Sequence, residues 1–180
     1  MSRNMPDILS RICTRLYTLI LRCRGAKTGR GSVLHHSTDV MNASRIMLGE
    51  DSTIYKNVSI YPDKSGYFIM GNRSHAAPYC YFLIADNRIE IGNDVAIGPF
   101  CAFFCHSNSP EGAGKVFSEN YVDSDIIIGS NVFIGAHCTV LPGTIIPDRV
   151  VIGANSLVSG ELESGFIYAG SPAKKIKSLN

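Results

Sequence analysis

Residues Ile128–Leu162 read IGSNVFIGAHCTVLPGTIIPDRVVIGANSLVSGEL and repeat one six-residue pattern without interruption. Each hexad opens on an aliphatic residue, in the order Ile128, Ile134, Val140, Ile146, Ile152 and Val158. The residue four places after each is again small or apolar. A fixed period of six fits neither an α-helix nor a lone alternating strand, but it is typical of a solenoid of very short strands. The stretch therefore predicts stacked coils around one aliphatic column.

The same hexads recur upstream, so that the solenoid is expected to cover roughly residues 40–162. Two interruptions are expected, a short one at 61–69 and a longer one at 104–125. Three strands of six residues give about 18 residues per coil, and hence about five coils. The predicted fold is mainly β, a parallel β-helix that forms one domain.

Composition and charge restrict the class of function. Hydrophobic residues make up 45% of the chain and the net charge is +2, so no global charge points to nucleic acid. The six cysteines show no CxxC spacing, and Cys101 and Cys138 occupy inward hexad positions as small hydrophobes. No secretory signal is evident, because arginines interrupt the apolar N-terminal stretch. We expect a reduced, cytoplasmic compartment.

The N-terminal stretch predicts an amphipathic helix. Apolar residues recur at helical spacing from Pro6 to Cys23, four arginines occupy the remaining surface, and Gly25 is a plausible stop. The helix is too short in continuous apolar residues to cross a bilayer. Two interpretations stay open: the helix packs on the solenoid or on a neighbouring subunit, or residues 6–24 lie peripherally on the inner face of an anionic membrane.

The longer interruption carries the candidate chemistry. His106 stands at its start, directly after a predicted coil strand, and a loop that leaves a regular solenoid is available for function. Neutral imidazole accepts a proton near pH 7, so His106 is the candidate general base. Cys105 is a candidate nucleophile. Adjacent residues of an extended strand point to opposite faces, which makes a Cys105–His106 dyad a poor arrangement.

Three segments together resemble the hexapeptide-repeat acyltransferases. They are the hexads of Ile128–Leu162, the histidine loop before them, and the ending AGSPAKKI at Ala169–Ile176. The similarity is greatest to the sugar O-acetyltransferase branch, with its galactoside, maltose and polysaccharide-modifying members. It implies a left-handed parallel β-helix, a homotrimer, and acetyl-CoA as co-substrate in a groove between neighbouring subunits. It implies no metal.

The resemblance also implies roles for individual residues. His106 would be the general base for direct attack of an acceptor hydroxyl on the thioester, with a backbone N–H near Gly135–Ala136 as oxyanion donor. The cofactor-binding residues it implies are Ala136, Ala154, Ser159, Gly160, Lys174 and Lys177. Asp86 would contact the sugar. Without the resemblance, the two lysines read as an exposed basic tail and Asp86 as a corner residue.

These inferences predict three segments and one activity. Residues 1–29 form the basic helix, residues 30–165 the β-helix with its active-site loop at 104–125, and residues 166–180 a CoA-contacting tail. The expected activity is acetyl transfer from acetyl-CoA to a sugar hydroxyl, in surface-polysaccharide biosynthesis. N-acetylation of an amino-sugar nucleotide is the alternative acceptor chemistry.

Two other classes of protein remain open from the residues. A γ-type carbonic anhydrase uses the same solenoid and three zinc-binding histidines, for which His75, His106 and His137 are available. The closely spaced histidine pair of that family is absent. The other class is a non-catalytic trimeric scaffold that docks through its helix. Departures from the galactoside branch, including a missing asparagine and N-terminal cap region, disfavour free galactosides or maltose as acceptor.

Overall fold

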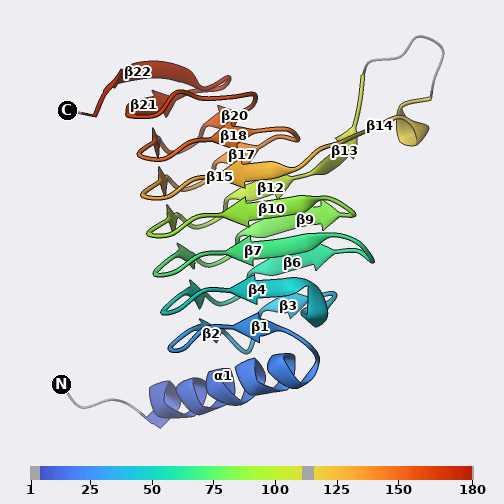
Figure 1. Ribbon diagram of the computed structural model, residues 1–180, viewed down its shortest axis with the longest axis vertical. Coiled ribbons are helices and arrows are strands. Elements are labelled where there is room, and N and C mark those ends of the chain that lie inside the picture. The colour runs from blue at the N-terminus through green and yellow to red at the C-terminus, as the bar shows by residue number, and fades with distance from the viewer. Residues whose placement is uncertain (1–4, 111–115, 180) are drawn as a thin grey trace.

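The chain winds in coils of three short strands, and strands of successive coils pair in parallel (Figure 1). The computed structural model describes residues 5–110 and 116–179, with backbone alone at 5–7. Sheet A contains β1 (Lys27–Thr28), β4 (Ile46–Leu48), β7 (Tyr67–Met70), β10 (Arg88–Ile91), β15 (Ile126–Ile128) and β18 (Ile145–Ile146). Sheet B contains β2 (Val33–Leu34), β5 (Thr53–Ile54), β8 (His75–Ala76), β11 (Ala96–Ile97), β16 (Phe133–Ile134), β19 (Val151–Ile152), β21 (Phe166–Ala169) and β22 (Lys174–Ser178). Sheet C contains β3 (Asp39–Val40), β6 (Ser59–Pro62), β9 (Tyr81–Ala85), β12 (Ala102–Phe104), β17 (Thr139–Val140) and β20 (Leu157–Val158).

Within the described residues, each sheet takes one strand from each of six coils, and sheet B adds β21 and β22 beyond the sixth coil. The estimate of five coils was wrong because the first coil, residues 27–40, carries few aliphatic hexad positions. The short interruption expected at 61–69 is also smaller than expected. Residues 61–62 and 67–69 belong to β6 and β7, which leaves only a turn at 63–66.

The interior is one apolar column, as the hexads predict. Ile97, Ile134 and Ile152 pair in register on β11, β16 and β19, and all three side chains are fully buried. Cys101 and Cys138 are buried in the same column as predicted. Their thiols donate to carbonyl oxygens of the next coil, at Sγ–O distances of 3.1 Å each. Stacking like residues in register buries a continuous core along the whole solenoid.

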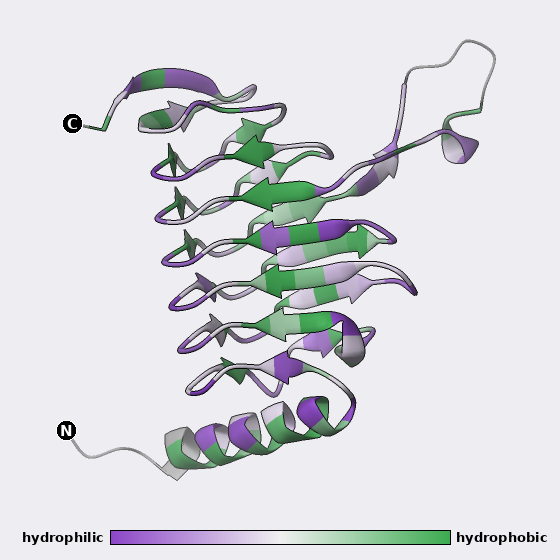
Figure 2. Cartoon of the chain, in the orientation of Figure 1, coloured by the Kyte–Doolittle hydropathy of each residue, from purple (hydrophilic) through white to green (hydrophobic). Residues whose placement is uncertain are grey.

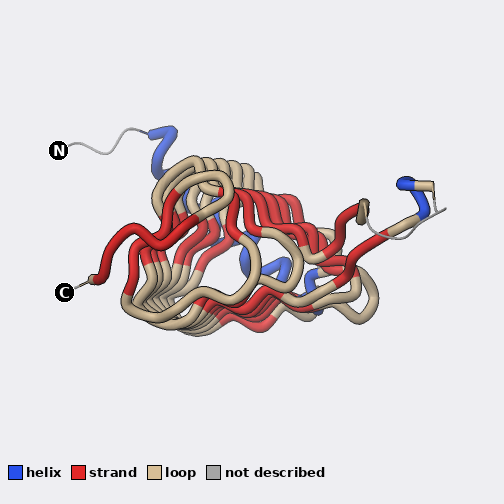
Figure 3. The backbone as a smooth tube through the Cα atoms, turned by 90° about the horizontal axis from the view of Figure 1, so that it is seen from above, coloured by secondary structure: helices blue, strands red, loops and turns tan. Residues whose placement is uncertain are grey.

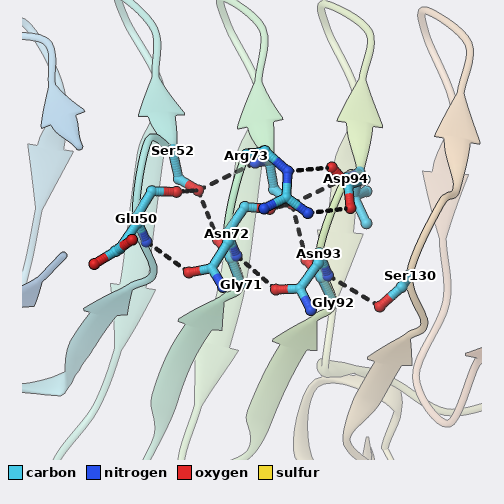
Figure 4. A network of polar contacts seen from close by, with 11 residues as sticks. Glu50, Ser52, Gly71, Asn72, Arg73, Gly92, Asn93, Asp94 and Ser130 are labelled. Atoms are coloured by element: carbon cyan, nitrogen blue, oxygen red, sulfur yellow. Dashed lines mark hydrogen bonds and ion pairs between the residues drawn. The ribbon is translucent and has the colours of Figure 1, made fainter. Parts of the chain in front are cut away.

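Each coil turns three corners, named here by the sheets they join: A–B (for example residues 92–95), B–C (98–101) and C–A (86–87). The A–B corner is stabilised by a ladder of side chains that cap backbone N–H groups one coil away (Figure 4). Oδ1 of Asn72 accepts from the backbone N of Glu50 at 2.7 Å, and Oδ1 of Asn93 accepts from that of Asn72 at 2.7 Å. The ladder satisfies corner N–H groups that face no strand partner.

Helix α1 (Met5–Cys23) covers the open end of the first coil (Figure 1). Oγ1 of Thr18 accepts from the backbone N of Leu34 at 3.0 Å, and the Tyr17 hydroxyl donates to the carbonyl of Thr38 at 2.6 Å. Leu21, which belongs to the helix, is buried against the solenoid. Packing on the solenoid, one of the two interpretations of this segment, is thereby confirmed. Among the described residues, no helix is long and apolar enough to cross a membrane.

The C–A corner of the fourth coil is replaced by a long arm. Strands β13 (His106–Asn108) and β14 (Tyr121–Asp123) pair antiparallel, and a short 3₁₀ helix at Phe117–Glu119 lies beyond them. Seen along the solenoid, the arm extends well outside the stacked coils (Figure 3). A second 3₁₀ turn, Ala43–Arg45, lies at the same corner of the first coil. The arm begins at His106, the candidate general base.

Candidate active site

The arm is held to the solenoid at its base. Cys105 is fully buried, its N–H donates to the carbonyl of Leu83, and its own carbonyl accepts from the N–H of Ser124. On the return strand, Asp125 accepts from the backbone N of Arg88 at 2.7 Å and pairs with its guanidinium at 3.4 Å. The first residue beyond this base is His106, so its backbone is fixed while its side chain faces outward.

His106 forms a hydrogen-bonded dyad with Asp123. The two residues pair in register across β13 and β14, and Nδ1 of His106 lies 2.8 Å from Oδ1 of Asp123. The Asn87 amide donates to the same Oδ1 at 3.1 Å. The hydrogen bonds from His106 and Asn87 hold the pKa of the Asp123 carboxyl below its usual range. Asp123 therefore stays ionised at neutral pH, as an orienting partner must.

This arrangement sets the chemistry of the imidazole. An Nδ1–H that donates to Asp123 leaves Nε2 as the proton acceptor of the neutral ring. In the described part of the chain no hydrogen bond to Nε2 is found, and the His106 side chain is 32% exposed. The ring also stacks on Tyr121, with centroids 4.6 Å apart. The carboxylate of Asp123 thus fixes the orientation of the imidazole, an arrangement that suits proton abstraction by Nε2.

Cys105 does not have the properties of a nucleophile. Its side chain is fully buried, and burial raises the pKa of the thiol to about 12. Its Sγ lies toward the carbonyl of Arg88 at 3.6 Å, inside the solenoid, whereas His106 faces out. The two side chains lie on opposite faces, which supports the argument from strand geometry against a dyad.

Asp86 lies at the C–A corner, one coil below the arm. It is next to Asn87, which links it to the carboxylate of the dyad. Its own Oδ1 accepts from both the backbone N and the hydroxyl of Ser65, and these bonds lower the pKa of Asp86. Asp86 is therefore on the same edge of the molecule as His106.

The residues expected at the cofactor lie on two corners and one strand. Ser159 and Gly160 follow β20 at the C–A corner, on the edge that carries His106. Ala136 and Ala154 stack on successive coils at the B–C corner, which is the opposite end of the sheet C strands. At about 3.3 Å per residue, a three-residue strand separates these two ends by about 10 Å. One chain therefore does not bring the six residues together.

Lys174 and Lys177 lie on β22, which pairs antiparallel with β21 and extends sheet B at the last coil. Both side chains are exposed, and within the described residues neither makes an ion pair. Their neighbour Lys175 is engaged: it pairs with Glu163 at 2.5 Å and lies 4.1 Å from the ring of Phe166. The two exposed cations remain available to an anionic ligand.

The histidines considered for zinc are not grouped. His75 lies on β8 against Tyr55, and His137 lies at the B–C corner, stacked on Phe100 at 4.9 Å. His106 stands on the arm instead. Among the residues described, no group of three metal-binding side chains is found.

The sequence pointed to His106 as a candidate but gave no indication of the side chains that the structure places around it. Asp123 and Asn87 lie 17 residues after and 19 residues before it, and no local pattern joins them. The sequence offers one signal for these partners, which is the pattern of a β-hairpin. An extended segment with alternating side chains, YVD at 121–123, returns to the solenoid just before the hexads resume at Ile126. Pairing that segment with the strand that starts at His106 would have placed Asp123 opposite the histidine.

Comparison with known proteins points to acyl transfer. Residues 125–160 match the family model "Bacterial transferase hexapeptide (six repeats)". The chain is 51% identical over 57 residues to the putative lipopolysaccharide biosynthesis O-acetyl transferase WbbJ of Escherichia coli K12, a match that spans 32% of this chain and 29% of that relative. It is 27% identical over 188 residues to the Escherichia coli galactoside O-acetyltransferase, across 98% and 91% of the two chains.

A solved structure shares the fold. It is a variant of AntD, an N-acyltransferase from Bacillus cereus, in complex with dTDP-4-amino-4,6-dideoxyglucose and coenzyme A. The two structures superpose with a TM-score of 0.79 at 24% identity, over 90% of this chain and 88% of the other.

Proposed function

We propose that this chain, whose hexads match the bacterial transferase hexapeptide model, is an acyltransferase that transfers an acetyl group from acetyl-CoA to a sugar hydroxyl. The observation that carries the proposal is the His106–Asp123 dyad at 2.8 Å, exposed at the base of the arm. The relatives named as sugar or lipopolysaccharide acetyltransferases support the acceptor class. The pathway we propose is surface-polysaccharide biosynthesis.

In the proposed step, Nε2 of His106 removes the proton of the acceptor hydroxyl as its oxygen attacks the thioester carbonyl. The new C–O bond forms, the tetrahedral oxyanion collapses, and the C–S bond breaks. The CoA thiolate then takes the proton from the imidazolium, so that the products are the acetyl ester and CoA. Asp123 stabilises the transient imidazolium through Nδ1. No acyl-enzyme is formed, in agreement with the buried, high-pKa thiol of Cys105.

The site we propose is completed between chains of a homotrimer. Ala136, whose backbone N–H makes no hydrogen bond among the described residues, is the proposed oxyanion donor, yet it lies at the far end of sheet C from His106. The arm also projects beyond the coils with Val116 and Phe117 exposed by 62% and 67%. A neighbouring chain that covers these side chains would bring its B–C corner toward His106.

Acetyl-CoA would lie in the groove between two such chains. Ala136 and Ala154 offer small corner residues that let a pantetheine arm approach the backbone, and Ser159 and Gly160 supply polar backbone groups from the other corner. Lys174 and Lys177 would meet the nucleotide phosphates, since both are exposed cations. The AntD structure is a complex with coenzyme A, which supports this choice of cofactor.

N-acetylation of an amino-sugar nucleotide is the second candidate. It is favoured by the substrate of the AntD structure, an amino sugar linked to dTDP. The same histidine base serves a hydroxyl or an amine, so the two activities differ in product rather than in mechanism. They are separated chemically, because an acetyl ester is cleaved by mild alkali or hydroxylamine whereas an acetamide is stable.

The test is a panel of acceptors with purified full-length protein and acetyl-CoA. Free thiol release gives the rate, and mass spectrometry before and after mild alkali identifies the product. We expect turnover with a hydroxyl acceptor and an alkali-labile acetyl group. An alkali-stable product would replace the first candidate by the second. Failure to bind acetyl-CoA by calorimetry would refute both and favour a non-catalytic scaffold.

A further inference from the structure

The outer face of α1 is apolar and lacks a partner. Figure 2 shows the hydrophobic side of the helix turned away from the coils. Six large apolar side chains there are between 47% and 62% exposed: Ile8, Leu9, Ile12, Leu16, Leu19 and Ile20. Leu21 is not among them, because it packs against the solenoid and is buried. At 100° per residue the six fall within an arc of about 120°, so they form one continuous stripe.

Arginines border this stripe on both sides. On the helical projection, Arg11, Arg15 and Arg22 lie along one edge and Arg24 along the other. All four are exposed, and in the part of the chain described none pairs with a carboxylate. The guanidinium of Arg22 is directed to the first coil, where it donates to Thr28 and to the carbonyl of Gly29. Arg11 and Arg15 line an open groove of about 620 Å³ between α1 and strands β2 and β5.

Charge is distributed very unevenly along the chain. Residues 8–38 contain six arginines or lysines and no acidic residue. Residues 39–180 contain ten arginines or lysines against fourteen acidic residues, a balance of −4. The positive charge of the protein is thus concentrated on the helix and the first coil, at the end of the solenoid opposite β22 (Figure 1).

We propose that α1 is an in-plane anchor that docks the protein on an anionic phospholipid bilayer. The apolar stripe enters the boundary between headgroups and acyl chains, and Arg11 and Arg15 at its border bind lipid phosphates. A second copy of the helix is a poorer occupant. Its arginines would face these arginines, and the helix sequence offers one acidic residue, Asp7, against them, whereas anionic lipid satisfies both the stripe and its borders.

Co-sedimentation of the full-length protein with phosphatidylcholine vesicles, with and without phosphatidylglycerol, tests this proposal. We expect binding that requires phosphatidylglycerol and weakens with salt. Each arginine near such a surface is worth about a five-fold change in partitioning, so Arg11→Gln combined with Arg15→Gln should weaken binding about twenty-five-fold. Leu16→Asp should weaken it by more than about ten-fold, since a leucine that would enter the bilayer becomes a charge.

Met41→Asp is the matched control, because Met41 is 53% exposed on the first coil, outside the helix. It should bind vesicles like the wild type. Unchanged circular dichroism and unchanged acetyl-CoA binding verify that each variant is folded. Three results would overturn the proposal: no binding of the wild type, equal binding to pure phosphatidylcholine, or full binding by Leu16→Asp. A Leu16→Asp variant that instead dissociates a helix-mediated oligomer would assign the stripe to a second copy.

Discussion

Replacing Asp123 by Asn tests the role of the dyad in depth. Asn keeps the size of the side chain but removes the charge that stabilises the imidazolium of His106, and its amide can present N–H instead of oxygen to Nδ1. A hydrogen bond to a charged group contributes about 1.5–3 kcal/mol. Because His106 and Asp123 are 32% and 52% exposed, solvent screening places the loss at the lower end. About 1.5 kcal/mol corresponds to a fall in kcat of about ten-fold.

The assay is acetyl transfer at saturating acetyl-CoA and acceptor, with both KM values measured. The fall should appear in kcat, because Asp123 acts through the base and touches neither substrate. Asp94→Asn is the matched control. Its carboxylate is 47% exposed and pairs with Arg73 at 2.7 Å, but it lies at the A–B corner, away from the arm. A kcat for Asp123→Asn within two-fold of wild type, or an equal fall in Asp94→Asn, would refute the orienting role.

Three further outcomes are expected. Ile134→Ala, in the middle of the buried column, should lower the free energy of unfolding by about 2–5 kcal/mol in urea titration, because the rigid coils cannot collapse into the cavity; a loss below that range would contradict the packing argument. Lys174→Ala should raise the KM for acetyl-CoA with a smaller effect on kcat, and an unchanged KM would make this lysine part of an exposed tail. The lowered pKa of Asp123 gives stability that is present above about pH 4, the unfolded value, and is lost as the pH falls through the folded pKa. The difference in Tm between wild type and Asp123→Asn should therefore be constant at neutral pH and vanish in acid, and a difference that persists in acid would assign it to another cause.

The regular part of the fold follows from the sequence because each hexad carries its own signal. An aliphatic residue every six positions determines which side chain points inward, and parallel stacking then aligns Ile97, Ile134 and Ile152 without further information. The first coil departs from this pattern because α1 covers it. Thr18 and Tyr17 satisfy its backbone groups, so the chain needs fewer aliphatic residues there.

Within the candidate site, only the residue at the interruption of the hexad repeat could be predicted from the sequence. His106 stands out because it begins the segment that leaves the solenoid. Asp123 and Asn87 were missed because their approach depends on the register of an antiparallel pair and on the stacking of two corners. Neither is encoded by a local motif. The proposed cofactor positions lie at separate places on the one chain described, and the sequence of one chain does not specify what would bring them together.

The most direct test of the central claim is the turnover of His106→Gln. Gln fills the space of the imidazole but cannot accept a proton. With acetyl-CoA affinity and oligomeric state verified as unchanged, the account predicts a loss in kcat of about 10²–10⁴-fold, the usual contribution of a general base. A variant that retains wild-type turnover would contradict it, and the reaction would have to be assigned to another residue.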